Sequence, residues 1–220
     1  MTEKHSGMRR KIGLFGGTFD PVHNGHLRMA LEAGEELALE QVRLLPCHRP
    51  PHRETPNVDS DQRTHMLRLA VESCPLLKLD DRELRRDGPS YTLETLQSLR
   101  AELGPEVSLI WVMGSDSFLG LESWHRWREL LDYAHLLVVA RPGWELPQEG
   151  ALHDWLLNHR AESQQSLEAT PAGSVLVRSL RLLPISATEI RQIIAGGQSP
   201  QFLLPESVWQ YVQKRRLYHP

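Results

Sequence analysis

Short apolar runs alternate along this chain with segments of helical periodicity. The runs are continuous rather than alternating with polar residues, which is typical of buried strands, and they cover 11–16, 42–46, 76–79, 107–114, 135–140 and 174–183. Between them, apolar positions recur at spacings of three and four, which predicts amphipathic helices, over 27–38, 61–73, 91–103 and 123–133. This alternation predicts a doubly wound α/β fold, a Rossmann-like parallel sheet with helices on both faces.

Two further segments and two loops complete the predicted organisation. Residues 151–169 are expected to form an inserted polar helix, and 205–218 a terminal helix with Pro205 at its start and basic residues at its end. Proline and charge mark 47–60 and 141–151 as surface loops. Because no linker interrupts the pattern, we expect one domain over 1–220, with a sheet core (8–184) and a C-terminal phosphate-binding and helical subregion (185–220).

Composition narrows the class of protein. Hydrophobic residues make up 40% and charged residues 24% of the 220 positions, which is ordinary for a soluble globular domain. The net charge of −3 provides no basic field, so we expect neither nucleic acid nor a membrane as a partner. Cys47 and Cys74 are far apart and form no CxxC pair. With no apolar signal or membrane-spanning run either, the sequence predicts a cytoplasmic location.

The turn after the first strand is the first candidate site, because ligands of doubly wound sheets gather at the carboxyl ends of the strands. The stretch "GLFGGTFDPVHNGHLRMA" covers residues 13–30. Gly16 and Gly17 allow a tight bend and close approach to a ligand, and Thr18 offers a hydroxyl. Asn24 or Gly25 can open the next helix, whose exposed N–H groups suit a phosphate.

His23 and His26 stand one helical turn apart, so both rings can face the same anion. Two ring N–H donors there would bind a polyphosphate and would matter most where charge grows during nucleotidyl transfer. Two alternatives remain open: His23 caps the turn while His26 packs, or the pair binds zinc, for which no third ligand is evident. Neither the lysine-containing phosphate loop nor the GxGxxG pattern is present.

Later segments offer further polar groups. In "ISATEIR" (185–191), Ser186 is a predicted N-cap with Glu189 completing a capping box. The same helix start could bind phosphate through Ser186, Thr188 and Arg191.

The run 107–114 ends in "GSDSF", where Gly114 permits close approach and Asp116 could accept a bond from a ribose hydroxyl. The alternative is that Asp116 caps a short helix. Trp124 and Trp127 fall in one predicted helical turn, so one face is expected in the core, while an indole facing the cleft could stack on a flat ring.

The first motif resembles a known signature. "GGTFDPVHNGH" is similar to that of the nucleotidyltransferase superfamily, whose HxGH motif binds the triphosphate of ATP or CTP. Within that superfamily, the chain resembles bacterial nicotinate mononucleotide adenylyltransferases over nearly its whole length. The matching segments are "PPH" (50–52), "GPSYTLETL" (88–96), "GSDSF" (114–118), "WHRWREL" (124–130), "ISATEIR" (185–191) and "LPESVWQYVQKRRLY" (204–218).

The resemblance implies roles for particular residues. His23 and His26 would be catalytic, and the ATP-binding set would be Gly16, Gly17, Thr18, Phe19, His23, His26, Gly114, Asp116, Ile185, Ser186, Thr188 and Arg191. The substrate-binding set would be His48, His52, Arg53, Tyr91, Thr92 and Trp124, with Trp124 stacking on the pyridine ring and the helix start at Tyr91–Thr92 receiving its carboxylate.

Several points within these sets stay open. Ala187 stands where relatives often have serine, and Arg53 where they often have lysine, so the basic residue that meets the substrate phosphate is undecided. A purely structural interpretation makes Ser90 the N-cap and Tyr91 a residue at the edge of the core.

The implied reaction is attack by the 5′-phosphate of nicotinate mononucleotide on the α-phosphorus of ATP, which gives deamido-NAD and pyrophosphate. Mg²⁺ would be carried mainly by the ATP phosphates, without a resident metal site. A related transferase that uses nicotinamide mononucleotide, phosphopantetheine, or a phosphoalcohol with CTP is the first alternative, against which Trp124 and Tyr91–Thr92 argue. A noncatalytic nucleotide sensor and a histidine-rich metal protein are the others. The oligomeric state is open, with a homodimer as one alternative.

Overall fold

A single parallel sheet organises the molecule. The computed structural model describes residues 9–48, 56–141 and 143–219. Within these residues, seven strands pair in the order β3-β2-β1-β4-β5-β7-β6, and all of the pairings are parallel. The strands are β1 (Lys11–Gly17), β2 (Gln41–Pro46), β3 (Leu77–Leu79), β4 (Ser108–Gly114), β5 (His135–Ala140), β6 (Arg160–Ala161) and β7 (Val175–Ser179). The predicted doubly wound, Rossmann-like sheet is therefore confirmed.

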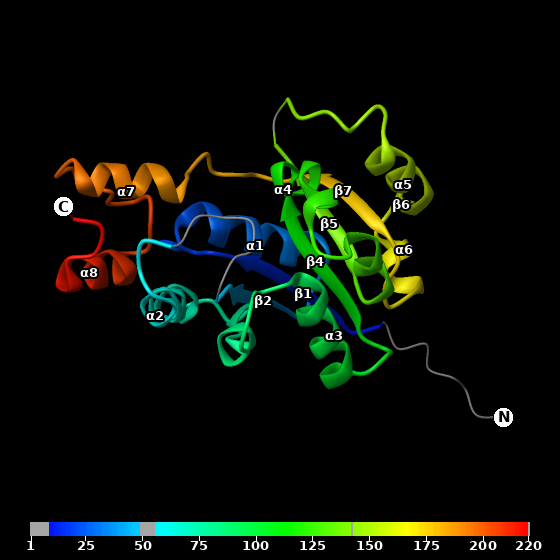
Figure 1. Cartoon of the computed structure of the whole chain (residues 1–220), viewed down its shortest axis with the longest axis horizontal. Coiled ribbons are helices and arrows are strands. Elements are labelled where there is room, and N and C mark those ends of the chain that lie inside the picture. The colour runs from blue at the N-terminus through cyan, green and yellow to red at the C-terminus, as the bar shows by residue number, and fades with distance from the viewer. Residues whose placement is uncertain (1–8, 49–55, 142, 220) are drawn as a thin grey trace.

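Helices connect the strands and follow the last of them (Figure 1). They are α1 (Asn24–Glu36), α2 (Ser60–Val71), α3 (Thr92–Leu103), α4 (Ser115–Leu119), α5 (Ala151–His159), α6 (Gln165–Ala169), α7 (Ala187–Ala195) and α8 (Glu206–Arg215), with 3-10 segments η1 (Arg82–Arg85), η2 (Leu121–Ser123) and η3 (Trp127–Asp132). In the part of the chain that the structure describes, no helix has the length and apolar character needed to cross a membrane.

The two faces of the sheet form separate hydrophobic cores because successive strand residues point to opposite sides. In β4, Ile110 and Val112 pack with α1, α2, α7 and α8, whereas Trp111 and Met113 pack with α3, α4, α5, η2 and η3. Helices thus cover both faces, as the alternating pattern predicts. The C-terminal helices belong to the first core through Ile190 on α7 and Val208 on α8.

The sheet order reverses at its centre. From β1 the chain passes outward through β2 and β3, and then returns to place β4 on the other side of β1. Connections therefore leave the carboxyl ends of β1 and β4 in opposite directions. This is the topological switch point at which ligands of open α/β sheets bind.

Three predicted elements differ from those observed. The helix expected over 123–133 is replaced by η2 and η3, because Arg126 adopts a left-handed backbone (φ 51°) between them. The helix expected over 151–169 is divided into α5 and α6 by β6, which pairs with the edge of β7. The strand expected over 174–183 ends at Ser179, opposite Ala140, because its neighbour β5 also ends there.

Candidate active site

A cavity of about 320 Å³ opens at the switch point. It lies where β1 and β4 end, and the starts of α3 and α4 form part of its wall. Seven residues singled out from the sequence line it: Gly16, Thr18, Tyr91, Thr92, Gly114, Asp116 and Trp124. The structure therefore brings together segments that are spread over more than a hundred positions of the chain.

The start of α1 adjoins this cavity. His23 is the N-cap, and its Nδ1 accepts the backbone N–H of His26 at 3.3 Å. The two rings are stacked, with centroids 3.7 Å apart, and the His26 ring also packs against Phe19 in a T-shaped arrangement and against Phe15 in a tilted one. Phe15 lines the cavity, so it connects the histidine pair to the cavity wall. The alternative that His23 caps the turn is thus confirmed, and this capping coexists with a ring pair able to donate to an anion.

The charge of His23 follows from its burial. Its side chain is 4% exposed, and desolvation lowers its pKa to about 4. The ring is therefore neutral near pH 7. Because Nδ1 accepts a hydrogen bond, the single ring proton is on Nε2. His23 can thus donate one hydrogen bond to an anion without carrying a positive charge.

Two glycines allow the backbone to approach neighbouring groups closely. A Cβ at Gly25 would lie 3.0 Å from the His23 ring and 3.3 Å from the carbonyl oxygen of Ile185. A Cβ at Gly16 would lie 2.6 Å from the Trp111 ring in the cavity wall. The spacing of glycine and histidine in "HNGH" therefore has a steric reason. It leaves room for both the first ring and the segment before α7.

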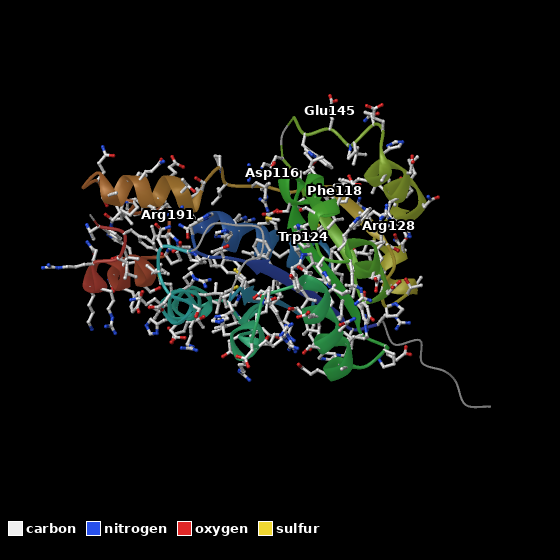
Figure 2. All side chains as sticks on the ribbon, in the orientation of Figure 1. Asp116, Phe118, Trp124, Arg128, Glu145 and Arg191 are labelled. Carbon is white, nitrogen blue, oxygen red and sulfur yellow. The ribbon has the colours of Figure 1, made fainter. Side chains whose placement is uncertain are left out.

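The start of α7 lies against the β1–α1 turn. Ser186 caps α7 by accepting the backbone N–H of Glu189 at 3.1 Å, as predicted. Arg191 donates to the carbonyl oxygen of Asp20 at 2.7 Å and to the Thr188 hydroxyl at 3.2 Å. The structure thus places two helix N-termini, those of α1 and α7, side by side (Figures 1 and 2).

Asp116 lies in the first turn of α4, directly after β4, on the other side of the cavity (Figure 2). Its side chain is 64% exposed and forms an ion pair with Arg141 at 3.0 Å. Gly114 is the N-cap of α4, and no side chain caps this helix. The alternative that Asp116 acts as a helix cap is therefore wrong, and its carboxylate is exposed at the edge of the cavity, paired with Arg141.

The two tryptophans predicted to share a helical turn separate in the structure. Trp124 has extended backbone and lines the cavity, with its ring edge-on to Trp111 at 6.5 Å. Trp127 is buried in the core against Trp155, at 5.0 Å between ring centroids. Of these two tryptophans, Trp124 is the one that can meet a ligand in the cavity.

Tyr91 is the residue that precedes α3, and its ring stacks on His125 at 4.5 Å. Ser90 is not the N-cap, so that alternative is wrong. Its hydroxyl instead accepts the backbone N–H of His48 at 2.9 Å, across the cavity wall. This bond places His48 beside the start of α3.

The remaining predicted residues lie around the cavity or outside it. Gly17 ends β1, and the Phe19 ring is buried in the core below His26. The cavity lining does not include His23, His26, Ile185, Ser186, Thr188 or Arg191; they gather at the β1–α1 turn, which meets the cavity wall through the contact of His26 with Phe15. His52 and Arg53 lie outside the described residues.

Several residues of the site were not predicted from the sequence. Trp111, Cys47 and His125 also line the cavity. Arg63 on α2 is 1% exposed, and its guanidinium donates to the carbonyl oxygens of Thr18 (2.6 Å) and Cys47 (2.9 Å), which joins the ends of β1 and β2. His125 could have been found from the sequence, because it is adjacent to Trp124. The other three residues could not, because their contacts form where distant segments of the chain pack together.

The described side chains that could ligate a metal ion are few around this cavity and already have partners. Among the described residues, no three His, Cys, Asp or Glu side chains are grouped so that they could hold a metal ion. The Asp20 carboxylate is engaged by Asn57 and Tyr218, and that of Asp116 by Arg141. Of these two carboxylates, that of Asp116 lines the cavity.

Comparisons with known proteins converge on one class. The profile of the cytidylyltransferase-like family matches residues 14–193. A protein of Cellvibrio japonicus named "Probable nicotinate-nucleotide adenylyltransferase" is 55% identical over 96% of this chain and 100% of its own length. Proteins with the same name from Pseudomonas putida (strain W619) and Aeromonas hydrophila are 49% and 46% identical, over 95% and 97% of this chain and 95% and 99% of their own lengths.

Solved structures agree with the fold. Plasmodium falciparum nicotinic acid mononucleotide adenylyltransferase, complexed with NaAD, matches with a TM-score of 0.71 at 16% identity, over 95% of this chain and 97% of that one. Its complex with APC matches with a TM-score of 0.69 at 15% identity and the same coverage. At this identity the likeness shows the fold alone.

Proposed function

Because this chain belongs to the cytidylyltransferase-like family, as one of its nicotinate-nucleotide adenylyltransferases, we propose that it joins ATP and nicotinate mononucleotide. An oxygen of the 5′-phosphate of the mononucleotide attacks the α-phosphorus of ATP. A new phosphoanhydride bond forms there as the bond between the α- and β-phosphates breaks. The products are deamido-NAD and pyrophosphate.

One observation carries this assignment: two stacked histidines and two helix N-termini meet beside a cavity that ends at an accessible tryptophan. The histidines and the starts of α1 and α7 offer N–H donors for a triphosphate. Trp124 lies at the cavity wall, where an aromatic ring could stack. The N–H donors at one end suit the triphosphate of ATP, and the tryptophan at the other end suits the pyridine ring of the mononucleotide.

At the phosphate end, we propose that His23 and His26 act as catalytic donors to the phosphates of ATP. The neutral His23 supplies its Nε2–H. Ser186, Thr188 and Arg191 would bind the phosphates from the side of α7, since Arg191 is held at the β1–α1 turn. These donors stabilise the charge that develops in the transition state because they are already in position.

The adenosine part of ATP is assigned to the ends of β1 and β4. Gly16 and Gly114 line the cavity there, and Asp116 stands exposed at its edge, suited to accept from a ribose hydroxyl. Gly17, Thr18, Phe19 and Ile185 complete the proposed ATP-binding set; the buried ring of Phe19 supports His26.

At the other end, Trp124 would stack on the pyridine ring of the mononucleotide. Tyr91 and Thr92 stand at the start of α3 and line the cavity, so the free N–H groups and the positive end of the helix dipole lie at its wall. A carboxylate is favoured there over an uncharged amide, which would distinguish nicotinate from nicotinamide. His48, held beside Ser90, and the basic residues His52 and Arg53 are proposed to meet the phosphate of the mononucleotide.

The chemistry needs alignment and charge neutralisation more than a strong base, because the attacking phosphate is already ionised near neutral pH. A divalent cation is general for adenylyl transfer from ATP, and we propose that it is Mg²⁺, entering as part of the ATP complex. It neutralises phosphate charge when bound. Asp116 is the described carboxylate that lies at the cavity.

Further proposals concern the chain as a whole. We propose that it works as one domain, because α8 packs on α2 and Tyr218 bonds to Asp20 near the other end of the chain. A single cooperative unfolding transition would support this. A cytoplasmic location, where ATP is abundant, is proposed with it and is tested by cell fractionation.

Pyrophosphate release tests the function directly. Purified protein with Mg²⁺ and ATP is assayed with nicotinate mononucleotide, nicotinamide mononucleotide or phosphopantetheine as the second substrate. We expect the highest kcat/KM with nicotinate mononucleotide and identification of deamido-NAD as the product. Preference for another acceptor would replace the specific assignment, and no release with any acceptor would contradict transferase activity.

A further inference from the structure

Asp20 is a buried carboxylate at the centre of the β1–α1 turn. It is 4% exposed, and three donors reach it. The hydroxyl of Tyr218 donates to Oδ1 at 2.7 Å, whereas the backbone N–H and the side-chain amide of Asn57 donate to Oδ2 at 2.8 and 3.3 Å. The carboxylate is thus held by two segments that are remote from it in sequence.

The same residue also touches both parts of the proposed phosphate site. Its carbonyl oxygen accepts Nη1 of Arg191 at 2.7 Å. It also lies three positions before His23, which caps α1. A shift of the backbone at Asp20 would therefore displace a partner of Arg191 close to His23, and both of these residues are proposed to bind ATP.

Tyr218 reaches Asp20 from the end of the chain. After α8, the backbone adopts left-handed conformations at Arg216 (φ 53°) and again at Tyr218 (φ 64°). Such conformations are unfavourable for residues with a side chain, so they persist only where the surrounding contacts stabilise them. Burial and the adjacent Asp20 raise the pKa of the Tyr218 hydroxyl, which therefore keeps its proton and acts as donor.

We propose that Tyr218 is a positioning residue for ATP, whose hydroxyl holds the Asp20 carboxylate away from the Arg191 guanidinium. The inference rests on the proposed function, which assigns Arg191 to the phosphates. Without the hydroxyl, Oδ1 of Asp20 has lost its donor within a buried environment, where an unpaired carboxylate oxygen is costly. Arg191 is a cation that already bonds to the same residue, through its carbonyl oxygen. A bond between the two would withdraw Arg191 from the triphosphate.

This effect differs from a general loss of stability. A purely structural contact would lower the amount of folded enzyme, which reduces the apparent kcat but leaves both KM values unchanged. A positioning role instead raises the KM for ATP and leaves the KM for nicotinate mononucleotide near its original value. The KM values of the two substrates distinguish a positioning role from a structural one, because the residues proposed to bind the mononucleotide, Trp124 and Tyr91, lie at the other end of the site.

The test compares Tyr218→Phe with Tyr211→Phe. Tyr211 lies on α8, where its ring packs with His65 and Arg215, so it is a matched control outside the proposed site. We expect Tyr218→Phe to raise the KM for ATP roughly tenfold, which corresponds to one lost interaction of a charged group, with less than a twofold change for the mononucleotide. Tyr211→Phe is expected to leave both values unchanged.

Equal effects of the two substitutions, or equal changes in both KM values, would overturn the proposal. Asn57→Ala, which removes only the weaker side-chain bond to Oδ2, is a second variant in case Tyr218→Phe does not fold. We expect it to shift the KM for ATP in the same direction by a smaller factor, and no shift would count against the proposal.

Failure of the proposed function can be recognised separately. It would appear as absence of pyrophosphate release by the unmodified enzyme. In that case, equilibrium binding of ATP measured by calorimetry still tests the inference, since Tyr218→Phe is expected to weaken ATP binding about tenfold relative to Tyr211→Phe. Unchanged ATP binding would reject it, whatever the reaction.

Discussion

His23 and His26 stack face to face at the start of α1, with ring centroids 3.7 Å apart and ring planes 23° apart. Two positive charges at this separation would repel each other strongly. Burial prevents that repulsion by lowering the pKa of His23 to about 4, so this ring stays neutral. The pair can therefore face an anion with N–H groups in fixed positions, without the cost of a buried imidazolium pair.

The first prediction concerns His23 itself. In His23→Ala the Nε2–H donor is lost, and kcat should fall by about a hundredfold or more, as is common when one transition-state donor is removed. The cap of α1 is lost as well, at a cost of about 1 kcal/mol in the free energy of unfolding. Steady-state assays and urea unfolding measure the two effects separately. A folded variant with near-normal kcat would refute the catalytic assignment.

The second prediction is that unfolding depends on pH through buried histidines. His135 is fully buried, and burial lowers its pKa to about 4, as for His23. The unfolded chain binds a proton at each position below about pH 6.5, but the folded chain does so only near pH 4. The stabilising contribution is complete above pH 6.5 and is lost as the pH falls toward 4, by up to about 3 kcal/mol per histidine.

The variant His135→Gln isolates one of these contributions. Its free energy of unfolding should fall less between pH 7 and pH 5 than that of the unmodified protein, when both are measured by urea unfolding. Burial raises the pKa of the Glu83 carboxyl, so protonation of Glu83 changes the free energy of unfolding with pH in the opposite direction. Comparing the two proteins removes this contribution, because both contain Glu83. Identical pH slopes for the two proteins would show that His135 titrates normally in the folded state.

The third prediction tests the glycine between the histidines. In Gly25→Ala the new methyl group would press on the His23 ring at 3.0 Å and on the carbonyl oxygen of Ile185 at 3.3 Å. Alanine favours a helix over glycine, so stability should change little. We expect a fall in kcat of roughly tenfold, because displaced donors stabilise the transition state less well. Gly196→Ala, whose added Cβ would lie 3.3 Å from the Gln192 carbonyl oxygen at the end of α7, is the control.

Activity equal to that of the unmodified enzyme in Gly25→Ala would show that the His23 ring can move without consequence. A loss of activity in both glycine variants would point to general distortion instead. The expected pattern is therefore a selective loss at Gly25.

Local signals predicted the parts of the site that are built from neighbouring residues. Ser186 and Glu189 are three positions apart, so their capping bond could be predicted from spacing alone. The start of α1 at Asn24 agrees with the prediction that Asn24 or Gly25 opens this helix. The alternation of buried strands with helices was sufficient to predict the parallel sheet, because it reflects burial on both faces.

Contacts between distant segments could not be predicted in this way. Tyr218 and Asp20 are 198 positions apart, and no periodicity relates them. Arg63 appears as one polar residue on a predicted helix, although its guanidinium joins the ends of two strands. The left-handed Arg126 was also missed, since arginine rarely adopts that conformation. Its effect was to separate two tryptophans that the sequence placed in one helical turn.

The last prediction uses that separation. Trp124 lines the cavity, whereas Trp127 is buried against Trp155, so alanine substitutions should affect different quantities. Trp124→Ala removes a stacking surface, and loss of such stacking commonly costs about 1–3 kcal/mol, or a rise of roughly tenfold in the KM for nicotinate mononucleotide. The KM for ATP should stay within about twofold of its original value, because the phosphate donors are unchanged. Trp127→Ala should instead lower the free energy of unfolding by about 3–5 kcal/mol, through lost burial and the cavity that remains.

Urea unfolding and separate KM measurements for the two substrates distinguish these outcomes. A Trp124→Ala enzyme with an unchanged KM for the mononucleotide would place the pyridine ring elsewhere in the cavity, and His125, which stacks on Tyr91 in the same wall, would then be the next aromatic candidate.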